Sequence, residues 1–470
     1  MTEQEVLSKQ SDALEYHLER VVRMLHRQRH GSDGSDVLED SRNLAALQRE
    51  IDQLHPADVA HILESLPQQD RLSIWNLVRS DRDGEILLEV SDAVRESLLA
   101  DMDGSEILAA AEQLDTSDMA ELAEDLPEDV VHELMQRLDA SEREQFRSAM
   151  SYEDDQVGAL MDFDMVTIRE DVSLETVLRY LRRLKELPEQ TDKLFVVNSD
   201  NVLTGVLPLK WLLVNDPARE VSEVMAADAN TFNADENVVR TALAFERYDL
   251  VSAPVVDNDG RLIGRLTIDA MVDVMREESD SEVLGRVGLR EGEDIFASVW
   301  KSVRNRWTWL AINLVTAFIA SRVIGLFEGS IEKLVALAAL MPIIAGIGGN
   351  SGNQTITMIV RALALGQVSV ANARRLLRKE LGVAVLNGVI WGGVIGIAAW
   401  VLYGSLSLGL VMTAAMTLNL LLAALMGVLI PMTLIRLGRD PALGSSVMIT
   451  ALTDSGGFFI FLGLATIFLI

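Results

Sequence analysis

Hydrophobic residues dominate the last third of the chain, where five long apolar stretches follow residue 300. They cover residues 307–327, 331–358, 381–403, 408–435 and 442–470. Each is long enough for the roughly 20 residues that a membrane-spanning helix needs. A buried helical core of a soluble protein would not explain five such stretches whose connections also follow one charge rule. The pattern predicts a five-helix α transmembrane domain at residues 304–470.

The charges between these stretches predict their orientation. Two connections are basic, through Arg361, Arg374, Arg375, Arg378 and Lys379 in one and Arg436 and Arg439 in the other. Basic loops stay in the cytoplasm, and an odd number of spans places the two ends of the chain on opposite sides. The polar N-terminus lacks the apolar core of a signal peptide. We therefore expect a multi-pass membrane protein with its N-terminus in the cytoplasm and its C-terminus outside.

Asp454 is the acidic residue that this pattern places deepest in the membrane. It lies about 12 residues into the final stretch, or about 18 Å along a helix, near the middle of the bilayer. Hydrocarbon does not solvate a carboxylate, so such a residue usually marks an ion path. The alternative is a structural carboxyl that pairs with an arginine or stays protonated. The nearby Gly456 and Gly457 allow other helices to approach closely.

Amide side chains and glycines interrupt the second apolar stretch. Asn350, Asn353 and Gln354 lie in a glycine-rich run, residues 342–355, that begins with a proline. Such residues break or kink helices, and freed carbonyl oxygens survive in a membrane only where they face protein or water. We expect a broken helix whose oxygens line an ion path, with a glycine packing seam as the alternative. Weaker candidates, equally suited to helix–helix contacts, are Asn387, Thr417 and Asn419.

Carboxylate, amide and carbonyl oxygens are the ligands that hard cations such as Mg²⁺ prefer. Magnesium dehydrates reluctantly, so one carboxylate per chain would hold the hydrated ion through water. Two chains that meet at a symmetry axis would bring two Asp454 side chains together and match the charge of a divalent ion. The sequence thus predicts a divalent-cation path with Asp454 as its central residue.

Helical repeats are expected at residues 39–157, after an N-terminal extension, residues 1–38, to which we assign no role. The segment 54–67 recurs as 114–127, and both copies end in Leu-Pro. Short amphipathic helices that end in this way predict an all-α superhelical domain built from repeats.

Two similar α/β units follow, at residues 158–220 and 221–275. Each shows the order strand, helix, hairpin, helix, with Gly205 and Gly264 at corresponding positions of the last strand. This order resembles tandem CBS domains, a regulatory module that often binds adenosine nucleotides. ATP is therefore a candidate ligand, although the run Thr267-Ile268-Asp269 is one residue shorter than the usual Thr-x-x-Asp motif.

An acidic helix is expected to connect these units to the first span, at residues 276–303. Asp269, Asp273 and Glu277 follow one another at four-residue spacing and Asp280 comes three residues later, so all four share one helix face. Like charges at this spacing cost stability unless a cation lies between them. A solvated helix face is the alternative. We expect Mg²⁺ to bridge this face to acidic patches elsewhere, which makes the helix a lever on the membrane domain.

Charge is unevenly distributed along the chain. Of its 41 Lys and Arg and 71 Asp and Glu residues, 12 and 5 lie from residue 301 onward, which leaves 29 and 66 before it. The first part therefore carries a net charge near −37 and the second near +7. A soluble part this acidic repels itself unless cations neutralise it, and we expect no binding to nucleic acid. The lack of cysteine excludes disulfides, thiolate catalysis and thiolate metal sites.

Together these features resemble the MgtE-type magnesium transporter and channel family along nearly the whole chain. The most specific motifs are Pro342-x3-Gly346-x2-Gly349-Asn350-x-Gly352-x-Gln354, Asp440-Pro441-Ala442-Leu443 and Asp454-x2-Gly457-Phe458. The resemblance implies a homodimer in the bacterial inner membrane with a pore at the dimer axis. It further implies that Asp454 is the key ion site, that Asp440 lies near the cytoplasmic mouth, and that Mg²⁺ closes the pore through the cytosolic domains.

The resemblance also implies a set of regulatory Mg²⁺ ligands. They are Asp269, Asp273, Glu277, Glu278 and Asp280 around the acidic connecting, or plug, helix, with Asp118, Glu121 and Asp125 as contributors from the helical domain. This chain has Asp280-Ser281-Glu282 where the family more often has a denser acidic run.

We therefore expect a channel for Mg²⁺, as a divalent cation, that Mg²⁺ itself closes; the sequence does not determine its selectivity among Mg²⁺, Co²⁺ and Mn²⁺. A secondary transporter that exchanges Mg²⁺ against Na⁺ or H⁺ is the alternative, because one mid-membrane carboxylate suits either. An enzyme is not expected, since an intramembrane aspartyl protease needs two acids that share a proton and each chain offers one. A membrane-anchored sensor would not need Asp454.

Overall fold

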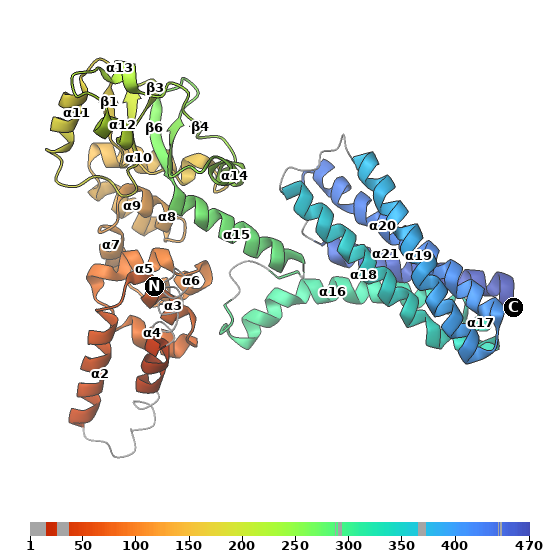
Figure 1. The fold of residues 1–470 in the computed structure, drawn as a ribbon. Helices are drawn as coiled ribbons and strands as arrows, with labels where there is room; N and C mark the ends of the chain where they lie inside the picture. The colour runs from red at the N-terminus through yellow and green to blue at the C-terminus, as the bar shows by residue number, and fades with distance from the viewer. Residues whose placement is uncertain are drawn as a thin grey trace. The chain divides into compact units, whose positions relative to one another are not determined.

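The computed structural model describes residues 16–25, 37–286, 288–289, 294–364, 373–439, 441 and 444–470. The chain divides into two units, which are considered separately. The first, Met1–Glu278 with Gly292–Ala297, holds short helices and two small sheets (Figure 1). The second, Ser279–Glu291 with Ser298–Ile470, holds long apolar helices. The fold class is therefore multidomain, as predicted.

A 12-residue period builds the helical domain that follows α2 (Val37–Ile51). Successive helices begin 12 or 24 residues apart, which explains why segment 54–67 recurs 60 residues later, after five periods. These helices are α3 (Pro56–Glu64), α4 (Gln68–Trp75), α6 (Asp92–Leu99), α7 (Gly104–Ala111), α8 (Thr116–Ala123), α9 (Glu128–Arg137) and α10 (Ala140–Ala149). The 24-residue interval is the one between the starts of α4 and α6, and it contains a 3₁₀ turn, η1 (Ser80–Arg82), and α5 (Asp83–Glu89).

Polar N-caps start several of these helices and so fix their register. Asp103 and Asp139 each form a capping box with the glutamate three residues on, Glu106 and Glu142. Asp115 accepts a hydrogen bond from the Asp118 amide at 2.9 Å. Each cap satisfies backbone N–H groups that have no partner within their own helix. Buried Ile, Leu, Val and Ala side chains from every helix then form one continuous core, which confirms the predicted all-α domain.

Two three-stranded sheets form the tandem α/β units, which confirms the predicted repeat. The first sheet has the order β1 (Thr167–Arg169), β2 (Lys193–Val197), β3 (Leu203–Pro208), and the second β4 (Phe232–Asn233), β5 (Ser252–Val256), β6 (Leu262–Thr267). In both, the first pair is parallel and the second antiparallel. The accompanying helices are α11 (Leu174–Leu181), α12 (Leu209–Val214), α13 (Val221–Val224) and α14 (Val238–Tyr248).

The two predicted glycines occupy equivalent positions in these sheets. Gly205 pairs with Val196 and Gly264 with Val255, each next to an irregularity in the strand register. A Cβ at Gly205 would lie 2.6 Å from the Ala226 carbonyl oxygen, so no larger residue fits without a backbone shift.

Helix α15 (Ile268–Arg286) carries the predicted acidic face. It starts directly after β6, and its buried Met271 and Val274 join the core of the second α/β unit. The helix is therefore anchored at its N-terminal end by apolar packing. The next described helix, α16, begins at Val299.

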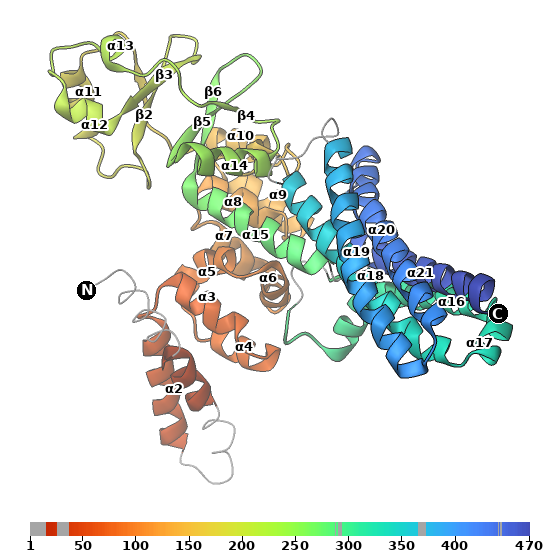
Figure 2. The ribbon, with the colours of Figure 1, turned by 45° about the vertical axis from the view of Figure 1, so that its right-hand side comes forward.

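Long helices form the second unit, as the apolar stretches predict (Figure 2). They are α16 (Val299–Gly325), α18 (Ala336–Ala364), α19 (Ala373–Tyr403), α20 (Leu406–Arg436) and α21 (Ser445–Leu469), with the short α17 (Glu328–Lys333) between the first two. Among the described residues, four of these helices are long and apolar enough to cross a membrane. The exception is α18, whose 29 residues reach about 43 Å but include the amides of the second apolar stretch.

The prediction that α18 is broken is wrong. The helix runs without interruption from Ala336 to Ala364, with Pro342 inside it. Its glycines instead form a packing seam: a Cβ at Gly348 would lie 2.2 Å from Asn419 Nδ2, and one at Gly352 2.5 Å from Ile449 Cγ1. Neighbouring helices can satisfy the backbone around a proline in a membrane, so the sequence signal for a break does not require one.

Helix α20 lies at the centre of this bundle. It packs against α18, α19 and α21, while α21 also contacts α16 and α18. Half of the residues in the most apolar segment of α20 are buried, compared with 6% of those in the corresponding segment of α16. Close approach to α19 depends on Gly396, where a Cβ would lie 2.6 Å from the Gly409 carbonyl oxygen.

Candidate functional site

Asp454 lies in the first half of α21, nine residues after its first residue. At 1.5 Å per residue this is about 14 Å along a helix of about 37 Å, so the carboxylate is somewhat shallower than predicted but still well inside the helix. The residue is half-buried, and within the described part of the chain it forms no ion pair. The pairing with arginine that we considered as an alternative is therefore not seen among these residues.

The amide-bearing part of α18 lies against the same part of α21. Ser446 Oγ donates to Asn353 Oδ1 at 3.1 Å. A Cβ at Gly349 would lie 3.7 Å from Thr453 Oγ1, so this glycine places α18 next to the residue that precedes Asp454. The structure thus brings the amide run and the carboxylate to adjoining positions on two neighbouring helices.

The remaining two amides are not covered by the described residues of the second unit. Asn350 and Gln354 are exposed, and with Gly346 they follow one another at four-residue spacing along one face of α18. Neutral amide oxygens on an uncovered face at this depth need a polar partner, either water or another protein chain. This face, together with Asp454, can therefore supply oxygen ligands to a hydrated cation.

The weaker candidates serve packing more than ion contact. Asn419 is fully buried and donates to the Ile344 carbonyl oxygen at 3.0 Å, which ties α20 to α18. The hydroxyl of Thr417 donates to the Thr413 carbonyl oxygen of its own helix at 2.8 Å. Asn387 is exposed on α19.

One predicted pore residue, Asp440, lies outside the described residues. A carboxylate that the sequence analysis overlooked, Glu380, is buried near the start of α19 and lies 3.2 Å from the ammonium group of Lys379. Its position within a basic connection gave a signal that could have been noticed, because a lone acid among arginines and lysines is unusual there.

A second group of carboxylates gathers where α8 and the end of α5 approach α15 within the first unit. We call this group the acidic interface. It comprises Glu89, Asp118, Glu121, Glu124, Asp162, Asp269, Asp273 and Glu277, whose charges influence one another. The predicted residues of α15 and of the helical domain are therefore brought together.

Burial and like charge both raise carboxyl pKa values at the acidic interface. For Asp118, burial and then the charges of Asp115, Glu121, Asp162 and Asp269 raise the pKa to about 7. Burial is also the main cause for Asp273, with Asp269 adding to the increase in its pKa. Raised values of this kind mean that the ionised carboxylates lack sufficient positive charge around them.

Arg95 provides part of the missing positive charge. It lies 3.1 Å from Asp125 Oδ2 and 3.5 Å from Glu121 Oε1. Burial raises the pKa of Glu121, Arg95 lowers it, and Glu277 and Asp273 raise it again. Asp125, one of the predicted ligands, is thus already engaged by an arginine.

Three members of the interface were missed by the sequence analysis. Burial raises the pKa of Glu89, and Asp273 adds to the increase. Burial and then Asp154 raise the pKa of Glu124 to about 7. Asp162, whose pKa burial raises, pairs with the buried Arg265 at 2.6 Å. No local pattern marks these residues, because the charges that raise their pKa values, such as Asp273 for Glu89 and Asp154 for Glu124, lie far away in the sequence.

Two predicted ligands, Glu278 and Asp280, are exposed on the C-terminal half of α15. Within the described residues, no three acidic or histidine side chains are grouped closely enough to chelate one metal ion. Because Mg²⁺ tends to retain its waters, the acidic interface fits ions held through water rather than a dry chelate.

The raised pKa values predict how the stability of the first unit depends on pH without divalent cations. Asp118 and Glu124 bind protons in the folded unit up to about pH 7, well above the pKa of an unfolded carboxyl. The free energy of unfolding should therefore fall as pH rises from about 4 to 7 and level off above that. Calorimetry of the full chain in detergent should show this fall, and Asp118→Asn should reduce it.

An exposed carboxylate on α10 offers a matched control. Glu144→Gln removes one charge outside the acidic interface and should leave the pH dependence unchanged. Equal pH dependence in Asp118→Asn and the unaltered chain would contradict the assignment.

Comparison with known families covers most of the chain. Residues 54–155 match the MgtE intracellular N domain, residues 157–210 and 221–277 match CBS domains, and residues 341–464 match the MgtE divalent cation transporter family. Asp454 therefore lies in the transporter match, Asp118 in the N-domain match and Asp273 in the second CBS match.

Individual proteins show the same likeness. The chain is 31% identical to the magnesium transporter MgtE of Thermus thermophilus over 434 residues, 90% of this chain and 95% of that protein. It is 27% identical to the MgtE of Bacillus subtilis over 89% of this chain and 93% of that one. A solved cytosolic domain of the Mg²⁺ channel MgtE with ATP is 28% identical, with a TM-score of 0.46, and 54% of this chain covers 99% of it. Since the Thermus thermophilus transporter is 31% identical and matches nearly end to end, the chain belongs to the MgtE family of divalent cation transporters, which are not enzymes.

Proposed function

We propose that the protein is a homodimeric Mg²⁺ channel of the bacterial inner membrane, with a cytoplasmic N-terminus and an external C-terminus. The observation that carries the proposal is Asp454, an unpaired, half-buried carboxylate among the described residues, next to the amide run of α18. The basic residues that flank the membrane helices, such as Arg374 and Arg436, support the orientation.

A dimer would complete the ion path. The uncovered face with Asn350 and Gln354 would gain a polar surrounding if a second chain packed nearby and enclosed water. Two Asp454 carboxylates would then balance the charge of one divalent ion. One carboxylate from each chain, acting through water, suits a magnesium ion that keeps most of its hydration shell.

The acidic interface would make the channel responsive to its own cargo. At high cytosolic Mg²⁺, ions would occupy the space between α8 and α15 and hold the two together. At low Mg²⁺, the unneutralised charges of residues such as Asp118 and Asp273 would push the domains apart. The ion shifts the equilibrium because only the compact arrangement brings several carboxylates together.

An exchanger of Mg²⁺ against Na⁺ or H⁺ is the competing mechanism, since Asp454 could also bind those ions. The two mechanisms differ in a liposome assay. Uptake through a channel continues without a second ion gradient, whereas exchange requires one.

The two α/β units suggest a second ligand. They enclose a cavity of about 350 Å³ between β2, β3 and β5, which is large enough for a nucleoside. Val206, Pro208 and Pro254 form apolar walls, while Lys193 and Lys210 carry positive charge. We propose that this cavity binds an adenosine nucleotide such as ATP, with the base against the apolar walls and the phosphates near Lys210.

Replacement of the membrane carboxylate should abolish transport. Asp454→Ala removes the charge that attracts the ion, so we expect Mg²⁺ uptake into liposomes to fall at least about tenfold, the effect of about 1.4 kcal/mol. Ser455→Ala, at the adjacent position, should keep normal uptake. Both variants should still cross-link as dimers. Normal uptake by Asp454→Ala would refute the assignment of the ion path.

Neutralising one side of the acidic interface should weaken the response to Mg²⁺. In Asp273→Asn/Glu277→Gln/Asp280→Asn, fewer carboxylates bind the ion and less repulsion opposes closure without it. Patch recordings should therefore show a smaller difference in open probability between low and high cytosolic Mg²⁺. The control is a triple neutralisation of exposed residues on α9 and α10, Glu128→Gln/Asp129→Asn/Glu144→Gln. An unchanged response in the first variant would remove the acidic interface from the gating mechanism.

Isothermal titration of the full chain with ATP tests the cavity. Lys210→Ala should weaken binding at least about tenfold, because a lysine–phosphate contact is lost. Lys185→Ala, an exposed lysine that does not line the cavity, should bind as the unaltered chain does. Equal affinity of the two variants would place ATP elsewhere, and absence of binding to the unaltered chain would reject the ligand.

A further inference from the structure

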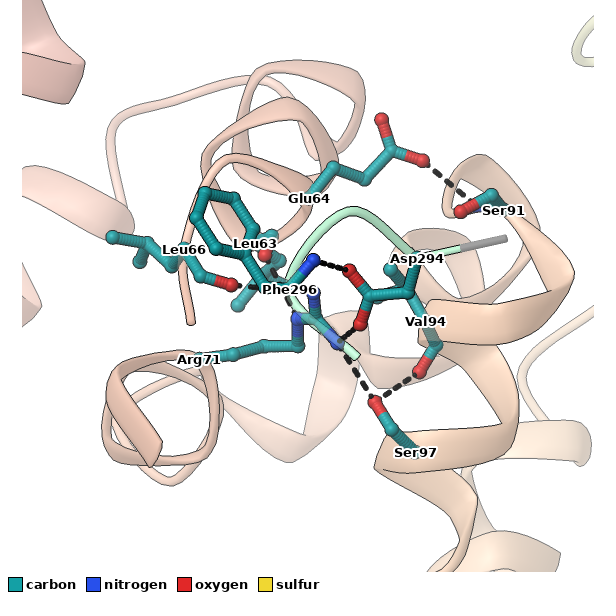
Figure 3. A network of polar contacts seen from close by, with 9 residues as sticks. All are labelled: Leu63, Glu64, Leu66, Arg71, Ser91, Val94, Ser97, Asp294 and Phe296. Atoms are coloured by element: carbon teal, nitrogen blue, oxygen red, sulfur yellow. Dashed lines mark hydrogen bonds and ion pairs between the residues drawn. The ribbon is translucent and has the colours of Figure 1, made fainter. Parts of the chain in front are cut away.

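Arg71 of α4 is completely buried, and its guanidinium group donates four hydrogen bonds (Figure 3). Its Nε donates to the Leu63 carbonyl oxygen at 2.9 Å and Nη2 to that of Leu66 at 3.2 Å. Its Nη1 donates to Ser97 Oγ at 3.1 Å and to Asp294 Oδ2 at 2.9 Å. A buried guanidinium requires a carboxylate partner, and this one comes from a residue 223 positions later.

Arginines at equivalent positions of the helical repeats make the same backbone hydrogen bonds as Arg71 but differ from it in their carboxylate partners. Arg95 and Arg143 bind the carbonyl oxygens eight and five residues before them, as Arg71 does. Arg95 takes its carboxylates, Glu121 and Asp125, from the helical domain itself. Arg71 instead takes Asp294, from the segment that precedes α16.

The segment around Asp294 is held in a defined turn. Its other carboxylate oxygen, Oδ1, accepts a hydrogen bond from the Phe296 amide at 2.8 Å, and its carbonyl oxygen accepts one from the Ala297 amide at 3.0 Å. Asp294 itself is 9% exposed. Only residues 295–298 separate it from α16, whose first turn Ser298 caps. The same aspartate thus forms the turn and binds the helical domain.

We propose that Arg71 and Asp294 couple the helical domain directly to the first membrane helix. The helical domain cannot move away without either breaking a buried ion pair or pulling the start of α16 with it. This connection runs in parallel to the one through α15 and does not depend on the α/β units. Arg71 acts here as a positioning residue. The consequence for transport rests on the proposed gating by Mg²⁺, whereas the contact itself does not.

Asp294→Asn is the most direct test, because asparagine keeps the Oδ1 acceptor for Phe296 and places an NH2 donor where Oδ2 faces Arg71, which removes both the charge and the acceptor of the ion pair. Hydrogen exchange of the full dimer should become at least tenfold faster in the peptide that covers residues 294–300. Glu85→Gln, which neutralises an exposed acid on α5, serves as the control and should exchange at the original rate. Unchanged exchange in Asp294→Asn would overturn the coupling, whether or not Mg²⁺ closes the channel.

Transport measurements test the functional part. In Asp294→Asn, half-inhibition of liposome flux should require at least threefold more Mg²⁺, while Mg²⁺ should still protect the helical domain from proteolysis at the original concentration. A shift in protection equal to the shift in flux would show a general loss of closure and overturn the coupling, as would unchanged half-inhibition. If Mg²⁺ never inhibits the unaltered channel, the proposed gating fails and hydrogen exchange alone decides the contact.

A double-variant cycle separates coupling from a purely structural role. Arg71→Met and Asp294→Asn should shift half-inhibition by similar factors, and the combined variant should shift it no further. Arg143→Met is the matched control, since that arginine makes the same two backbone bonds and Met119 already occupies the equivalent repeat position. Additive shifts, or an equal shift in Arg143→Met, would contradict the proposal.

Discussion

The burial of carboxylates close to one another is the constraint on which the first unit depends. Folding buries Asp118 and then places it near other carboxylates such as Asp269, and both effects raise its pKa to about 7. Arg95 pairs with Glu121 and Asp125. The compact arrangement therefore gains stability from protons or from cations, and a cell at neutral pH supplies mainly the latter.

The second unit differs in that ionisable side chains are few in its apolar helices, because burying a charge in a membrane is energetically unfavourable. Glycines on α18 and the buried amide of Asn419 hold α18, α20 and α21 closely together. This packing leaves Asp454 and the outward amides of α18 without partners among the described residues of one chain. The same close packing that stabilises the bundle thus decides which polar groups remain available to an ion.

Several features of the fold could be predicted because they depend on local patterns. The equivalence of Gly205 and Gly264 follows from two similar runs of residues, and the sheets show it. The break predicted in α18 does not occur. Pro342 and the glycines weaken an isolated helix, but α18 is not isolated. In the bundle those glycines meet Asn419 and Ile449, and helix–helix contact outweighs their weak helical preference.

By itself, the sequence determined the apolar stretches, the acidic first part and the tandem α/β units. These features depend on composition and on patterns among residues that are close together in the chain. Only the tertiary structure decided which acids meet across the acidic interface, such as Glu89 and Asp273. It also decided that Arg71 binds Asp294 across 223 positions. Contacts over such separations depend on how whole helices pack, and no residue pattern near either partner records that packing.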